Sequence, residues 1–173
     1  MPQGTSNNIV AIKQKRVSGC AAACLEMVST ALGQRLSQEL VISEMGGLKS
    51  YGLCTKRLAE FARSKGFSAT CYSATQDLHF EFTADILKEL LSPGSYLILT
   101  VDPQVLAGGV FSRKLHNIVL KSMSLELATY LDPKDGIEHD IAAEKLVQAW
   151  KIIAPKASVH TLVVRNLKSL MLK

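Results

Sequence analysis

Apolar residues in the first third of the chain recur at the spacing of α-helices. The segment from Cys20 to Leu32, "CAAACLEMVSTAL", has apolar residues at intervals of three and four, which predicts a helix with one apolar face. Gly33 follows it as the expected helix end. Two shorter helices, "SQELVISEM" and "TKRLAEFARSKG", are expected next, with Ser37 and Thr55 as their N-caps.

After the third helix the pattern changes to short apolar runs that are typical of β-strands. The expected strands are "FSATCY", "SYLILTV", "LHNIVLKS", "LELATYLD" and "SVHTLVVRN". Two more helices are expected among them, "TADILKELL" with Thr83 as its cap and "AAEKLVQAWKII" beginning near Ala142. Helices first and mostly antiparallel strands later predict an α+β fold rather than a doubly wound one. Residues 102–114 contain glycine, lack periodicity and are predicted to form a mobile loop.

Composition limits the size and class of the protein. The chain has 173 residues, of which 47% are hydrophobic and 20% charged, so we expect one folded domain over residues 1–173 with a single core. The net charge is +5, but the basic residues are scattered and aromatic residues are only 6%. No nucleic-acid partner is therefore expected.

Neither a cleaved signal peptide nor a membrane span is expected from the sequence. The N-terminus lacks a basic start with an apolar core, and the longest apolar runs are too short to cross a bilayer. The expected location is the cytoplasm of the producing cell, with export by a signal-independent route left open.

The four cysteines differ in their expected surroundings. A domain of this size needs no disulfide, so free thiols are expected. Cys20 lies in the first turn of the first helix, where the helix dipole favours thiolate and lowers the pKa. Cys24 lies one turn later on the apolar face and is expected in the core. For any single cysteine burial is the commoner outcome, so Cys20 needs support from other residues.

A thiolate nucleophile needs a histidine as its base, and the chain has four histidines. His79 and His139 lie in polar, loop-like segments, and His160 lies in a late strand without a nearby carboxylate. His116 instead begins an apolar strand directly after the long loop. It is therefore the candidate base, held rigidly at the edge of a strand.

Two further residues complete a candidate catalytic site. Asp132 ends the next expected strand in "TYLDPKDG"; this is an ordinary turn sequence, yet a hairpin of the two strands would bring Asp132 to His116. Gln14 stands six residues before Cys20. Its side-chain amide, together with the backbone N–H at the helix start, is a candidate donor to an oxyanion.

With these residues assembled, the chain resembles the papain-like cysteine peptidases, most closely the double-glycine leader peptidase family of bacteriocin exporters. The matching segments are "QKRVSGCAAACLEM", "HNIVL" and "DPKDG", although Gly-Cys-Ala replaces the Asp-Cys-Gly that is frequent in the family. The resemblance implies a papain-like fold, with N-terminal helices packed on a C-terminal antiparallel sheet. It also implies a nucleophile at Cys20, a general base and acid at His116, an orienting carboxylate at Asp132 and an oxyanion donor at Gln14.

The implied function is hydrolysis of a protein or leader peptide, with no metal or organic cofactor. The same thiol chemistry also suits a side-chain deamidase or an acyltransferase, and a small basic chain suits a secreted effector or toxin with an inhibitor or immunity protein as partner. A catalytically silent peptide-binding domain ranks third. A metal site built on Cys20 and Cys24 and completed by Cys54 or a histidine ranks last, because the spacing fits no common zinc pattern.

Overall fold

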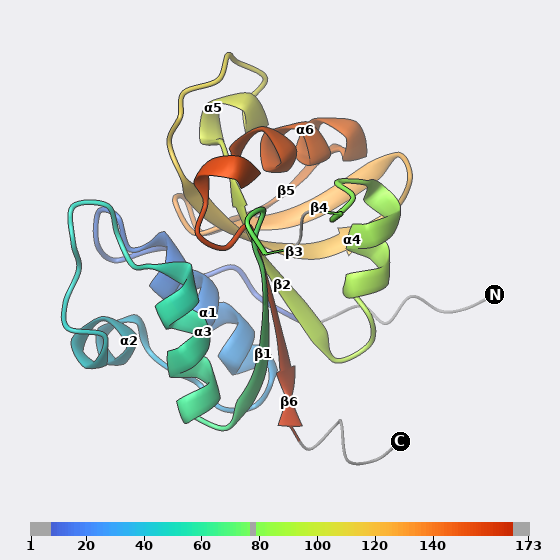
Figure 1. The fold of residues 1–173 in the computed structure, drawn as a ribbon. Coiled ribbons are helices and arrows are strands. Elements are labelled where there is room, and N and C mark those ends of the chain that lie inside the picture. Colours follow the sequence, from blue (N-terminus) through green and yellow to red (C-terminus); the bar gives the residue numbers. More distant parts are fainter. Residues whose placement is uncertain (1–7, 77–78, 168–173) are drawn as a thin grey trace.

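The computed structural model describes residues 8–76 and 79–167 of the chain (Figure 1). The elements follow one another as α1 (Cys20–Ala31), α2 (Gln38–Glu44), α3 (Thr55–Ser64), β1 (Phe67–Tyr72), α4 (Ala84–Leu90), β2 (Ser95–Val101), α5 (Pro103–Leu106), β3 (His116–Met123), β4 (Leu127–Asp132), β5 (Ile137–Ala142), α6 (Ala143–Ile153), the 3₁₀ helix η1 (Ala154–Lys156) and β6 (Thr161–Asn166). Within these ranges no helix is long and apolar enough to cross a membrane.

The six strands form one sheet in the order β1-β6-β2-β3-β4-β5, and every neighbouring pair is antiparallel. The α+β class and the antiparallel sheet predicted from the sequence are therefore confirmed. Strand β2 lies inside the sheet, and all seven of its residues are buried.

Strand β2 also shows how the two faces of the sheet are covered. Tyr96 and Ile98 belong to an apolar cluster with α1, α2 and α3, whereas Leu97 and Leu99 belong to a second cluster with α4 and α6. Alternate residues of a strand point to opposite faces, so the molecule has three layers with helices on both sides (Figure 1). The single core expected from the sequence is thus divided in two by the sheet.

Two of the three predicted N-cap residues cap their helices. Ser37 accepts a hydrogen bond from Leu40 N, and Thr83 accepts one from Ile86 N, as predicted. Thr55 does not cap α3, because the helix begins at Thr55 itself and Cys54 is the N-cap residue.

The segment that contains His139 is a strand rather than the loop predicted from its polar sequence. It forms β5, the edge strand beside β4, and its residues are partly or fully exposed. An edge strand that faces water has little apolar patterning, which is why the sequence did not reveal it. His79 does lie in an exposed turn, as expected.

The predicted mobile loop over residues 102–114 begins with the short helix α5 and is anchored at its base. The carboxylate of the fully buried Asp102 accepts hydrogen bonds from Gln104 N at 2.9 Å, Val105 N at 3.1 Å and Ser112 N at 2.9 Å. The prediction missed this anchor because nothing in the sequence indicates that Asp102 both caps α5 and binds Ser112 near the end of the loop.

Helix α6 offers a test of the second apolar cluster. Trp150 is fully buried, packs edge-on against Phe82 and donates from Nε1 to Thr161 Oγ1 at 3.0 Å. We expect Trp150→Ala to lower the free energy of unfolding by about 3–5 kcal/mol, measured by urea denaturation. Ile152→Ala in the same helix, at a residue 38% exposed, should cost no more than about 1 kcal/mol. Equal losses for both variants would contradict the three-layer arrangement.

Candidate active site

The nucleophile candidate stands at the start of α1, behind a tight turn. Cys20 is the first residue of the helix, as predicted. Ser18, two residues earlier, has a positive φ of 65°, and Gly52 packs against this turn so closely that a Cβ there would lie 2.8 Å from Ser18 O. With φ at +84° as well, position 52 requires glycine.

Strands β3 and β4 bring the predicted histidine and aspartate together. His116 is the first residue of β3 and Asp132 the last of β4, and the strands are antiparallel. His116 Nε2 lies 2.7 Å from Asp132 Oδ1, with the two side chains only 11% and 14% exposed. The hairpin prediction is therefore confirmed, although a bulge between Leu120 and Ser122 interrupts the pairing.

His116 also forms a hydrogen bond with Cys20. Since Nε2 is engaged by Asp132, the other ring nitrogen, Nδ1, is the one left for the sulfur. Burial lowers the pKa of His116, but the hydrogen bonds with Asp132 and Cys20 and their negative charges outweigh it and raise the pKa from 6.5 to about 9. The imidazolium form is thus stabilised at neutral pH.

The pKa of the sulfur is shifted in the opposite direction. Burial raises the pKa of Cys20, yet the hydrogen bond and charge of His116 lower it more, with help from Asn117. Cys24, completely buried one turn later, has a pKa raised well above its usual value because burial dominates there. Of the two thiols, Cys20 therefore has the lower pKa, and Cys24 is the core residue, as predicted.

Gln14 lies beside the turn after Asp132, and its side chain is engaged within its own loop. Gln14 N donates to Pro133 O at 2.7 Å, while the side-chain Nε2 donates to Arg16 O at 3.0 Å. Gly136, with φ at +77°, packs so closely that a Cβ there would lie 2.7 Å from Lys13 Cβ. The structure thus places Gln14 next to the Asp132 turn, and its role as an oxyanion donor stays a prediction.

A buried polar network that the sequence analysis missed holds the backbone on both sides of Gln14. Gln38 Nε2 donates to Lys13 O at 3.0 Å, and Gln38 Oε1 accepts from Lys15 N at 2.9 Å. Glu26, a fully buried residue of α1, accepts from Gln38 Nε2 at 2.9 Å and pairs with Arg35 at 2.7 Å. The only hint of this network in the sequence is Glu26, a carboxylate within the apolar run of the first helix.

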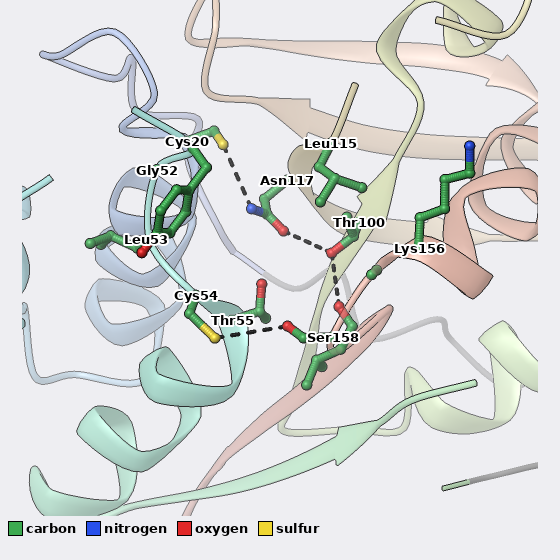
Figure 2. A pocket seen from close by; sticks show the side chains of 13 residues that line it. Cys20, Gly52, Leu53, Cys54, Thr55, Thr100, Leu115, Asn117, Lys156 and Ser158 are labelled. Atoms are coloured by element: carbon green, nitrogen blue, oxygen red, sulfur yellow. Dashed lines mark hydrogen bonds between the residues drawn. The ribbon is translucent and has the colours of Figure 1, made fainter. Parts of the chain in front are cut away.

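A cavity of about 270 Å³ opens beside Cys20 (Figure 2). It is bounded by residues 51–55 and 156–159, and by Thr100, Leu115 and Asn117. None of the lining residues comes from the predicted loop over residues 102–114. Asn117 was also missed: its Nδ2 donates to Cys20 Sγ at 3.6 Å.

The described residues contain no group of histidine, cysteine or carboxylate side chains suited to a metal ion, and all four cysteines are free thiols. Cys54 lies on the far side of the cavity from Cys20, against Ser158 Oγ at 3.8 Å. The arrangement fits nucleophilic catalysis by a thiolate with an adjacent imidazolium.

The charge on His116 makes the stability of the fold dependent on pH. Because its pKa is raised from 6.5 to about 9 in the folded state, its contribution is fully present below pH 6.5 and is lost as the pH rises through 9. We expect Asp132→Asn to lower the His116 pKa, measured by NMR titration of the imidazole. The stability lost in this variant should be largest below pH 6.5 and shrink toward pH 9.

Asp135→Asn is the matched control for this change, since it removes a carboxylate from the same turn. Asp135 Oδ2 contacts His139 Nε2 at 2.8 Å on the exposed edge strand. This variant should leave the His116 titration in place. A His116 midpoint that moves equally in both variants would show that Asp132 has no special effect on the imidazole.

The chain is similar to known proteins in part of its sequence and in its fold. The model of the Peptidase C39 family matches residues 8–89, which include Cys20 but end before His116 and Asp132. A comparison with curated proteins gave no match.

Three solved structures have a similar fold. One is a double glycine motif protease from an AMS/PCAT transporter in complex with its leader peptide, at 18% identity, TM-score 0.66 and coverage of 96% of each chain. The peptidase domain of Streptococcus ComA, a bifunctional ABC transporter of a quorum-sensing pathway, is 14% identical with a TM-score of 0.64, covering 92% of this chain and 99% of that one. A protein of Bacillus anthracis described as a C39-like peptidase is 16% identical with a TM-score of 0.68, covering 91% and 94%.

Proposed function

We propose that this chain is a cysteine peptidase of the Peptidase C39 family, whose model matches residues 8–89, and that it cleaves a leader peptide after a double-glycine motif, with Cys20 as nucleophile. The observation that carries the proposal is the buried pair of His116 and Asp132, whose Nε2 and Oδ1 atoms lie 2.7 Å apart, beside Cys20, whose pKa His116 lowers. The matching protease from the AMS/PCAT transporter, which was solved with a leader peptide, supports the choice of substrate.

In the proposed reaction His116 Nδ1 takes the proton from Cys20 Sγ, and the thiolate attacks the carbonyl carbon of the second glycine. The negative charge then lies on the carbonyl oxygen, where the Cys20 backbone N–H and the Gln14 amide would donate to it. For this the Gln14 side chain exchanges its bond with Arg16 O for one with the substrate.

Collapse of the tetrahedral intermediate breaks the peptide bond, and His116 gives its proton to the departing amine. The leader remains attached as a thioester on Cys20. Water, activated by His116, then attacks this thioester and releases the leader with a free carboxylate, which restores the thiol. Asp132 stabilises the imidazolium in both halves of the reaction.

The surroundings of Cys20 suit a substrate with small residues at the cleavage site. Cys20 is only partly exposed, and its sulfur borders a cavity of about 270 Å³ closed in by Gly52 and Leu53. A glycine has no Cβ, so its carbonyl can approach a recessed sulfur more closely than that of any other residue. A double-glycine motif would meet this requirement.

The same comparison suggests the setting of the reaction. The peptidase domain of ComA is part of an ABC transporter, so we place cleavage by this chain in the cytoplasm of the producing cell, on precursors about to be exported. The matching structures are described as peptidases. This favours backbone cleavage over the deamidase, acyltransferase and toxin alternatives.

The test uses a synthetic precursor peptide with a Gly-Gly motif and mass spectrometry of the products. We expect two fragments that meet after the second glycine, and a loss of at least about 10³-fold in kcat for Cys20→Ala and for His116→Ala. Cys24→Ala is the control, because Cys24 is a core residue on the same helix and its removal should leave turnover near the wild-type value.

Other outcomes would redirect the proposal. An intact peptide that gains about one dalton would indicate deamidation, since an amide is exchanged for an acid. Loss of turnover in Cys24→Ala with retention in Cys20→Ala would show that the nucleophile is misassigned.

A further inference from the structure

Asn117 follows the candidate base along β3 and reaches the nucleophile from the face of the sheet that α1 covers. Val119, two residues on and therefore on the same face as Asn117, belongs to the apolar cluster beneath α1, whereas His116 is the first residue of the strand and lies at its end. Asn117 Nδ2 donates to Cys20 Sγ at 3.6 Å (Figure 2). The sulfur therefore has two polar neighbours, His116 and Asn117, from consecutive positions of one strand.

The side chain of Asn117 is held in place by its own partner on β2. Thr100 faces Asn117 in the strand register, and its Oγ1 donates to Asn117 Oδ1 at 3.0 Å. Thr100 Oγ1 also lies 3.1 Å from Val159 O. Asn117 and Thr100 are 7% and 3% exposed, so the amide oxygen is anchored and the amide nitrogen is directed at the sulfur.

This arrangement discriminates between the two forms of the sulfur. An amide N–H is a donor, and a hydrogen bond from it is stronger to a negatively charged acceptor than to a neutral one. Little water reaches a side chain that is so deeply buried, which strengthens the preference further. The donor thus favours the thiolate over the thiol, independently of the charge on His116.

We propose that Asn117 is a further catalytic residue, which stabilises the Cys20 thiolate through its side-chain N–H while Thr100 holds the amide in position. The proposal rests on the assignment of Cys20 as the nucleophile. It adds a second donor to that assignment: His116 receives the proton from the sulfur, and Asn117 stabilises the negative charge that remains.

The experiment measures the rate of Cys20 alkylation by iodoacetamide between pH 4 and 10, read for each cysteine by mass spectrometry of peptides so that Cys54 is followed separately. Asn117→Leu has nearly the same size but no donor. We expect its alkylation curve to move to higher pH by about one unit, with a rate about tenfold lower at pH 6. Asn117→Asp should move the curve further, because its carboxylate repels the thiolate.

Hydrolysis supplies the second readout. In Asn117→Leu, kcat/KM should fall about tenfold near pH 6 and recover toward pH 8, where more of the sulfur is ionised. A loss caused only by weaker folding would not recover as the pH rises. Thr129→Val is the control, since Thr129 is buried in the same sheet and bonded to Asp140 Oδ1, away from Cys20.

The outcomes separate this proposal from the proposed function. If Asn117→Leu leaves the alkylation curve in place while His116→Ala moves it to higher pH, the role of Asn117 is overturned and the nucleophile assignment stands. A curve that moves to lower pH would show that the amide oxygen, not the nitrogen, faces the sulfur, and would also overturn the proposal. If neither variant moves the curve of Cys20, the nucleophile assignment itself fails.

Discussion

The antiparallel pairing of β3 with β4 fixes the positions of the chemically important groups. Because the two strands run in opposite directions, the first residue of β3 and the last of β4 lie at the same end of the sheet, and His116 meets Asp132 there. The other edge of β3 pairs with β2, and one of its faces is covered by α1. One strand thus carries His116 and supports α1, the helix that begins at Cys20. A shift of one residue in its register would turn His116 to the opposite face.

Burial by itself would disfavour the charged forms of the three side chains at this site. Removing Cys20, His116 and Asp132 from water favours the neutral form of each, as the raised pKa of buried Cys24 illustrates. The three charged groups instead stabilise one another, so that the pKa values of Cys20 and Asp132 fall and that of His116 rises. The charges on Cys20, His116 and Asp132 are therefore stabilised only when all three side chains are close together.

Much of this could be predicted from the sequence because local rules govern it. The spacing of apolar residues located α1 and the strands beside His116 and Asp132, and a hairpin was enough to bring the last two together. Edge strand β5 was missed because all of its residues are at least partly exposed, so that polar side chains predominate. The anchor at Asp102 was missed because its partner Ser112 is ten residues away.

Other contacts between distant segments, made by glutamine and asparagine, could not be read from the sequence. Gln38 supports the backbone around Gln14 from 23 and 25 residues away, and Asn117 reaches Cys20 across 97 residues. Glutamine and asparagine have no distinctive pattern in a sequence, since most are exposed. Their importance here comes only from what the tertiary fold places next to them.

The distance along the chain between Cys20 and its partners has a consequence during synthesis. Helix α1 leaves the ribosome first, and Asn117 follows 97 residues later, which at roughly 5–20 residues per second takes about 5–20 s. During that interval the sulfur is an ordinary cysteine thiol, mostly protonated at neutral pH. In the nascent chain Cys20 therefore has the pKa of an ordinary thiol. Its pKa falls only after β3, which carries His116 and Asn117, has been synthesised and has folded against α1.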